Sequence, residues 1–261
     1  MIKLAIPPAI PKALQNAGIQ LTNTNCASYN ANTNSYNQGL TKFDFNAPKN
    51  IYGRKSIKKI LIKAQNSKCC YCESIFLGTS HGAVEHFRPK GASRQGKNQA
   101  TIYPGYYWLA YDWSNLLFVC TGCNTAKSSY FPLKNPKQRA RNHSQNTLIE
   151  KPLFINPAFV EPSNHICFYY EAALGLTSEG KAMVDYIDLN RQSLLEDRLK
   201  ELRNFIYIIS SVIISHDRGD AVSLSKAIEY VRELTAPNSK FSSMMNSHLK
   251  SFLGSPAFSS L

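Results

Sequence analysis

Apolar residues recur at helical spacing in two stretches of the chain. Between residues 54 and 66 they fall at Ile57, Ile60, Leu61 and Ala64, a spacing of three and four that predicts a helix with one apolar face. A longer helix is expected from its single apolar stripe, formed by Leu195, Leu199, Leu202, Ile206, Ile209 and Ile213. Weaker helical patterns follow near residues 221–234 and 240–252, so the C-terminal part is expected to be mostly helical.

Shorter apolar runs predict strands. Residues 84–87 have strand character and stop before Pro89, residues 116–120 form a second run, and a helix is expected over 124–130. The aromatic stretch 106–113 is expected to form a short helix or turn. The pattern over residues 154–191 predicts short strands with turns at Asn156-Pro157, Leu174-Gly175 and Glu179-Gly180.

These patterns together predict an α+β protein in three parts. Residues 1–53 are expected to be an N-terminal arm, because residues 20–50 are rich in Asn, Thr and Ser with few apolar anchors. Residues 54–150 carry the motifs described below, and residues 151–261 form a region of short strands and helices. The longest apolar-rich stretch, near 205–214, is too short to cross a bilayer, so a soluble protein that does not enter the membrane is expected.

Charge is distributed unequally between the two halves of the chain. The net formal charge is +13. Residues 1–150 hold 19 Lys and Arg against 5 Asp and Glu, whereas residues 151–261 hold 11 against 12. A basic half beside a neutral half indicates a polyanionic partner, nucleic acid in particular. A basic surface that only aids solubility is the alternative, but such a surface would not need to be segregated.

Two Cys-x-x-Cys pairs are the most specific feature. Cys69 with Cys72 and Cys120 with Cys123 have the spacing of a tetrahedral zinc site. Clustered cysteines of this kind are typical of a reducing compartment, and a cytoplasmic protein is therefore expected. The alternatives are two unrelated reduced pairs or a redox dithiol. Zinc is favoured because its binding is worth about 10–16 kcal/mol, far more than closing the intervening loop costs. Cys70 is adjacent to the first pair and could compete for the metal, but it lacks the two-residue spacing to Cys72.

Between the two pairs lies the dipeptide Glu85-His86. Such a pair on a strand is usually structural, since neighbouring strand residues point to opposite faces. Two asparagines strengthen a functional reading, Asn124 directly after Cys123 and Asn115 upstream of it.

The order of these residues resembles that of the HNH nucleases, which have the ββα-metal fold. The segments that carry the resemblance are Glu85-His86, Trp113-Ser114-Asn115-Leu116 and Cys120-x-x-Cys123-Asn124-x-x-Lys127. The resemblance implies a zinc-stapled ββα nuclease module that hydrolyses phosphodiester bonds. It implies that His86 is the general base, that Glu85 and Asn124 hold Mg²⁺ or Mn²⁺, and that Asn115 ties down the loop and orients His86. It also implies that Arg88, Lys90 and Lys127 contact phosphates.

A narrower resemblance rests on the segments CCYCES, VEHFRPKG, YYWLAYDWSNL, FINP and DLNR. Together they look like the HNH component of Septu-type bacterial antiphage systems, which is also found as an effector in some retrons. This resemblance implies a partner ATPase of the ABC type and a nuclease restrained until infection. The alternative function is a zinc-stabilised nucleic-acid-binding or scaffold protein without catalysis, which would have no use for His86 together with Asn124.

Overall fold

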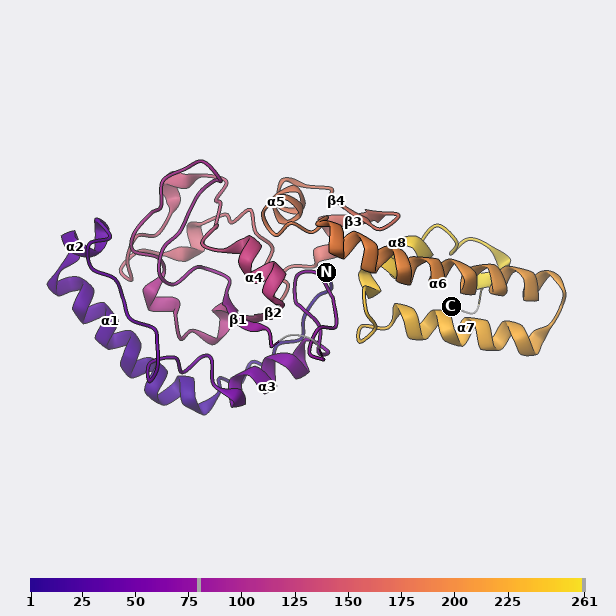
Figure 1. Ribbon diagram of the computed structural model, residues 1–261, viewed down its shortest axis with the longest axis horizontal. Helices are drawn as coiled ribbons and strands as arrows, with labels where there is room; N and C mark the ends of the chain where they lie inside the picture. The colour runs from indigo at the N-terminus through magenta and orange to yellow at the C-terminus, as the bar shows by residue number, and fades with distance from the viewer. Residues whose placement is uncertain (79–80, 260–261) are drawn as a thin grey trace.

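The chain folds into a body that carries both cysteine pairs and a long helical hairpin that extends from it (Figure 1). This arrangement comes from a computed structural model, which describes residues 1–78 and 81–259. Helices and small antiparallel sheets occur together, so the expected α+β class is confirmed. In the described ranges, no helix combines the length and apolar character needed to cross a membrane.

A ββα unit lies at the centre of the body. Strand β1, Ala83–His86, pairs antiparallel with β2, Leu116–Val119, and helix α4, Thr121–Lys127, follows directly. The register sets Glu85 opposite Leu117 and His86 opposite Leu116. All four residues of β2 are buried, which explains why its sequence is apolar without alternation. The two predicted strands are confirmed, and the helix begins three residues earlier than expected.

Helix α3, Lys55–Ala64, packs on β2 through its buried Ile57 and Leu61. Its C-terminal end is fixed by Gln65, whose side-chain amide donates to the Phe118 carbonyl at 2.7 Å and accepts from the Phe118 amide at 2.8 Å. The helix predicted from the spacing of Ile57, Ile60 and Leu61 is therefore confirmed.

The N-terminal region is more ordered than expected. Residues 14–37 form a π-helical turn, Leu14–Gly18, then α1, Ile19–Ala31, and α2, Thr33–Asn37. The prediction of a loop or arm over 20–50 is wrong here. These helices have no apolar stripe that a sequence pattern would show, because stacked aromatic rings hold them to the body. Tyr29 stacks on Tyr107 with ring centroids 5.1 Å apart, and Phe43 stacks on both Tyr36 and Tyr107.

The C-terminal region begins with a second hairpin, β3, Ile166–Tyr169, and β4, Ala172–Gly175, followed by α5, Ser178–Tyr186. The turn expected at Glu179-Gly180 is wrong, since both residues lie in α5. Thr177 caps this helix by accepting from the Gly180 amide. Glycine is required at 180 because a Cβ there would lie 1.8 Å from the His165 carbonyl oxygen.

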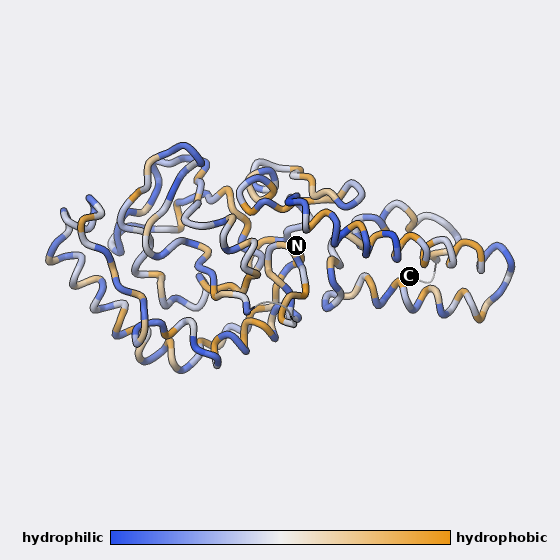
Figure 2. Tube along the Cα trace, viewed as in Figure 1, coloured by the Kyte–Doolittle hydropathy of each residue, from blue (hydrophilic) through white to orange (hydrophobic). Residues whose placement is uncertain are grey.

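The hairpin that extends from the body consists of α6, Gln192–Asp217, and α7, Ala221–Thr235, and α8, Ser242–Leu249, packs beside it. Hydrophilic residues gather where α6 turns into α7 (Figure 2). Three helices were expected in this region and all are present. The shorter helical turns of the chain are Tyr107–Leu109, Trp113–Asn115, Pro136–Gln138, Thr147–Ile149, Pro162–Asn164 and Pro256–Phe258.

The buried face of α6 differs from the predicted stripe. Leu202 and Ile209 are buried as expected, but Ile206 is 48% exposed and the inward face includes Leu194, Arg198 and Phe205. Arg198 occupies a core position because its guanidinium donates to the Leu189 carbonyl at 2.7 Å and lies over two aromatic rings. A hydrophobic pattern cannot predict a buried arginine.

Candidate functional site

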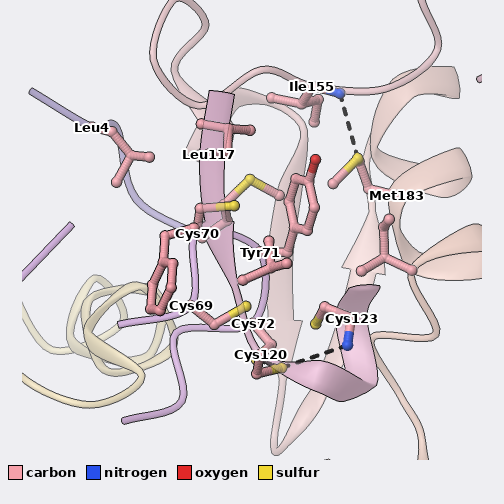
Figure 3. Close-up of a cluster of buried hydrophobic side chains, with 14 of the residues drawn as sticks. Leu4, Cys69, Cys70, Tyr71, Cys72, Leu117, Cys120, Cys123, Ile155 and Met183 are labelled. Carbon is pink, nitrogen blue, oxygen red and sulfur yellow. Dashed lines mark hydrogen bonds between the residues drawn. The ribbon is translucent and has the colours of Figure 1, made fainter. Parts of the chain in front are cut away.

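The four cysteines of the two pairs form one buried cluster. Their sulfur atoms all lie within 4.8 Å of one another, and the sulfurs point toward a common centre while Cys70 points away (Figure 3). Cys69 and Cys72 come from the loop after α3, and Cys120 and Cys123 come from the junction of β2 with α4. The cluster thus joins the loop after α3 to the junction of β2 with α4.

The spacing of the sulfurs fits a tetrahedral metal site. Cys72 Sγ lies 3.8 Å from Cys120 Sγ, and the edge of a zinc–sulfur tetrahedron with bonds of about 2.3 Å is about 3.8 Å long. All seven cysteines are free of disulfides. Hydrogen bonds from Cys120 and Cys123 lower the pKa of the Cys72 thiol, whereas burial raises the pKa of the Cys69 thiol. A bound metal ion would favour the thiolate form of the cysteines that hold it. This cluster could hold zinc.

Arg191, just before α6, contacts the same cluster from the C-terminal region. Its guanidinium donates to Cys123 Sγ at 3.7 Å and to Cys120 Sγ at 3.8 Å. Burial alone would lower the pKa of Arg191, but the charge of the neighbouring cysteines raises it above its ordinary value. Gly122 permits this approach, since a Cβ there would lie 3.2 Å from the guanidinium. Arg191 would therefore offset the negative charge of a zinc–tetrathiolate centre.

Glu85 and Lys127 form a buried pair across the ββα unit. Lys127 Nζ donates to Glu85 Oε1 at 2.5 Å and to the His86 carbonyl at 2.9 Å. The Lys127 side chain is fully buried, so it holds strand β1 to helix α4 and does not face solvent. The phosphate contact expected of Lys127 is not available in this arrangement, because its ammonium is committed to these internal acceptors.

His86 is held in one tautomer. Its Nε2 lies 2.9 Å from the Ala110 carbonyl oxygen, and because a carbonyl only accepts, Nε2 carries the hydrogen and Nδ1 keeps its lone pair. Burial, with the Lys90 ammonium adding to it, lowers the pKa of His86 well below its ordinary value. The imidazole is therefore neutral near pH 7 and has the basic nitrogen that a general base needs.

Asn115 links the segments around His86. Its side-chain oxygen accepts from the Arg88 amide at 2.7 Å, and its amide nitrogen donates to the carbonyls of Arg88 and Leu109. Its backbone carbonyl also accepts from the Phe87 amide. Asn115 therefore fixes the backbone that follows His86 relative to the backbone that carries the Ala110 carbonyl.

Asn124 lies on α4 one turn before Lys127 and is half-buried. Residues three apart on a helix share a face, so Asn124 is on the side of α4 that meets β1. Within residues 1–78 and 81–259, no hydrogen bond joins its side chain to Glu85 or His86. The structure thus brings Glu85, His86, Asn115 and Lys127 together through contacts, and relates Asn124 to them by its position on α4 alone.

Arg88 and Lys90, the other two residues predicted to contact phosphates, also have partners within the module. Arg88 Nε donates to Glu150 Oε2 at 2.9 Å, and Glu150 in turn accepts from Tyr106. Lys90 Nζ lies over the rings of Phe45 and Tyr52, and burial lowers its pKa. Both side chains are half-buried, and their contact with phosphates stays a prediction.

The N-terminal segment covers the imidazole. The Tyr52 ring meets His86 edge-on with centroids 4.6 Å apart, and only 4% of His86 is exposed. Arg191, Ala110 and Tyr52 were not identified from the sequence. Arg191 ends the DLNR segment and Ala110 lies within YYWLAYDWSNL, but those segments were noted only for their resemblance and no role was inferred for either residue. Tyr52 lies outside all of the segments noted.

Comparison with known proteins shows similarity to proteins of the Septu system. The chain is 40% identical to Septu protein PtuB of Bacillus mycoides over 164 residues, which is 61% of this chain and 54% of that protein. It is 31% identical to Septu protein PtuB of Bacillus thuringiensis over 142 residues, 54% of this chain and 44% of that protein. Septu protein PtuA of Bacillus mycoides is 27% identical over 164 residues, 59% of this chain and 22% of that protein.

The chain therefore spans about half the length of the PtuB proteins that it matches. No protein-family model matches the sequence.

Proposed function

We propose that this chain is an HNH-type endonuclease that hydrolyses phosphodiester bonds of nucleic acid and acts in a bacterial antiphage system. The observation that carries the proposal is the ββα unit itself. A four-cysteine cluster staples it, and its first strand ends in a neutral histidine whose Nε2 is held by the Ala110 carbonyl.

In the proposed reaction, His86 Nδ1 accepts a proton from the attacking water. Asn115 and the Ala110 carbonyl keep the ring in the required orientation and tautomer. Glu85 and Asn124 offer oxygen ligands of the kind that Mg²⁺ or Mn²⁺ takes. Lys127 engages Oε1 of Glu85 and thereby directs the carboxylate. When bound, the metal ion would neutralise charge on the scissile phosphate and its leaving oxygen. The four cysteines would hold structural zinc.

The partners are inferred from the similarity to Septu proteins. Both PtuA and PtuB proteins match the chain, and PtuB matches at higher identity and over a larger share of its length. This favours the PtuB-like component. We infer a partner protein in the same system, an ATPase of the ABC type, and nucleic acid as the substrate.

One observation favours the alternative of a zinc-stabilised nucleic-acid-binding protein without catalysis. Glu85 and His86 are 8% and 4% exposed, so a substrate reaches them only after the Tyr52 segment moves. The proposed nuclease needs the His86 imidazole for cleavage, whereas a protein that only binds nucleic acid does not need it.

Cleavage assays with the His86→Ala variant separate the two functions. Plasmid DNA and RNA are incubated with Mg²⁺ or Mn²⁺ and the full-length protein, with its partner added in a parallel reaction. Because general-base catalysis contributes about 10²–10⁴-fold, His86→Ala is expected to lower the metal-dependent rate by that factor. The control is His216→Ala, on the exposed side of α6, which is expected to cleave as wild type does. Equal rates for wild type and His86→Ala would refute the assignment of the base.

A further inference from the structure

Three lysines of α3 form an exposed row. Lys55, Lys59 and Lys63 are spaced four residues apart and all are exposed. At 1.5 Å per residue they repeat about every 6 Å over about 12 Å of the helix. Among residues 1–78 and 81–259, no carboxylate lies close enough to pair with any of the three.

Five other basic residues of the module are paired with carboxylates. Lys127, Lys68 and Arg88 pair with Glu85, Glu73 and Glu150 respectively. At the surface, Lys97 pairs with Asp185 and Lys134 with Glu179. The α3 lysines lack such neighbours because the sequence contains no acidic residue between Asp44 and Glu73.

The charge of α3 also opposes the local rules of helix stability. Arg54 is the N-cap and provides no side-chain cap, and the first turn contains no acidic residue. Cations near a helix N-terminus are unfavourable, and like charges four residues apart repel. Packing of Ile57 and Leu61 and the Gln65–Phe118 hydrogen bonds hold the helix in place. A segment that departs from several local rules while packing well is often one that serves a function.

The position of α3 connects the row to the candidate site. Tyr52, whose ring contacts His86, lies three residues before Lys55. The other end of the helix is bonded to β2, the strand that pairs with β1. Helix α3, which carries the row, thus starts near the segment that covers the imidazole and lies beside β1 and β2 (Figure 1).

We propose that Lys55, Lys59 and Lys63 form a binding surface for the phosphate backbone of the nucleic acid whose cleavage is proposed at the Glu85–His86 site. This inference rests on the proposed function and deepens it, because Lys127 is fully buried and Arg88 is paired with Glu150, although both were expected to contact phosphates. Ammonium groups contact the charged phosphates and not the edges of the bases. Binding through this surface is therefore independent of the base sequence of the nucleic acid.

The test is binding of labelled duplex DNA and single-stranded RNA by the full-length, zinc-loaded protein without added Mg²⁺, measured by fluorescence anisotropy over a range of salt concentrations. Each phosphate contact adds about 0.9 to the slope of log affinity against log salt for duplex DNA and about 0.7 for single strands. The triple variant Lys55→Gln, Lys59→Gln, Lys63→Gln is expected to lower that slope by about 2–3 and to weaken binding about 100-fold at 0.1 M salt. The nucleic acid with the larger change is the one that the row binds.

The matched control removes the same number of exposed lysines from the C-terminal helices, with Lys200→Gln, Lys226→Gln and Lys250→Gln, and is expected to bind as wild type does. Circular dichroism and melting temperature establish that both triple variants fold. A wild-type protein that binds neither polymer, or a row variant with unchanged affinity and slope, overturns the inference. Cleavage by wild type and by His86→Ala is measured separately. If wild type binds nucleic acid through the row but does not cleave it, the proposed catalysis is refuted and the binding surface is not. If wild type cleaves and the triple row variant binds with unchanged affinity and salt slope, the binding surface is refuted and the catalysis is not.

Discussion

Some side chains in the site are placed to bind a ligand and others hold the protein together, and the sequence distinguishes these two roles poorly. The cysteine spacing predicts a metal cluster, and the structure brings those four sulfurs together. The basic residues near the motif were expected to face a phosphate, but Arg88 and Lys127 each have a buried glutamate as partner. Sequence gives the charge of a residue but not its partner when that partner is 42 or 62 positions away.

The environment of His86 predicts the pH profile of cleavage. Burial, and after it the Lys90 ammonium, lowers the pKa of the imidazole well below 6.5. In the proposed reaction the base acts in its neutral form, so the rate is expected to stay at its plateau through pH 6.5 and to fall only as the pH drops through the lowered pKa. The measurement is the single-turnover cleavage rate between pH 5 and 8, with zinc content checked at each pH. A half-maximal rate above pH 6.5 would contradict the prediction.

Among the elements, those with a regular apolar period were predicted well and the others were not. Helix α3 and strands β1 and β2 follow from the pattern. Helices α1 and α2 do not, because stacked rings from distant segments hold them, as Tyr29 and Tyr107 show. The phase of α6 was misjudged because Arg198 takes a core position that only its distant carbonyl and ring partners explain.

The first turn of α3 predicts a stabilising substitution. Lys55 is the first residue of the helix, where a negative charge is favourable by about 0.3–1 kcal/mol. Lys55→Glu would also face Lys59 one turn later and replace a repulsion by an attraction of about 0.2–0.5 kcal/mol. The variant is expected to be about 0.5–1 kcal/mol more stable than wild type in urea denaturation of the zinc-loaded protein, while its binding of nucleic acid weakens.

The control for this helix is Lys55→Gln, which removes the unfavourable charge without adding a favourable one and is expected to give a smaller gain. A Lys55→Glu variant that unfolds at a lower urea concentration than wild type would show that the Lys55 ammonium has a stabilising partner.

At the scale of the whole molecule, the cysteine cluster joins parts of the chain that are far apart in sequence. It ties the loop after α3 to the start of α4, and through Arg191 it reaches the base of the α6–α7 hairpin. The division of the chain into residues 1–53, 54–150 and 151–261 stays a prediction. The contact of Arg191 with the cysteine cluster was not predicted, because no role was inferred for that residue of the DLNR segment.

Zinc removal tests this connection. A chelator is expected to lower the melting temperature strongly, since structural zinc contributes about 10–16 kcal/mol. It should also raise amide hydrogen exchange in α4 and in the first turns of α6, and much less in α7, because Arg191 loses its thiolate acceptors. In the control Arg191→Ala, zinc stays bound and only the start of α6 should exchange faster. Elemental analysis that finds no zinc in the purified wild type would refute the metal assignment.

The long interval between the cysteine pairs has a consequence for the nascent protein. Cys72 and Cys120 are separated by 47 residues, and ribosomes add about 5–20 residues each second. The first pair therefore leaves the exit tunnel about 2–10 s before the second, with reactive thiols and no complete set of ligands. Oxidants or foreign soft metals encounter two sulfurs during that interval, so correct maturation depends on the redox state around the translating ribosome.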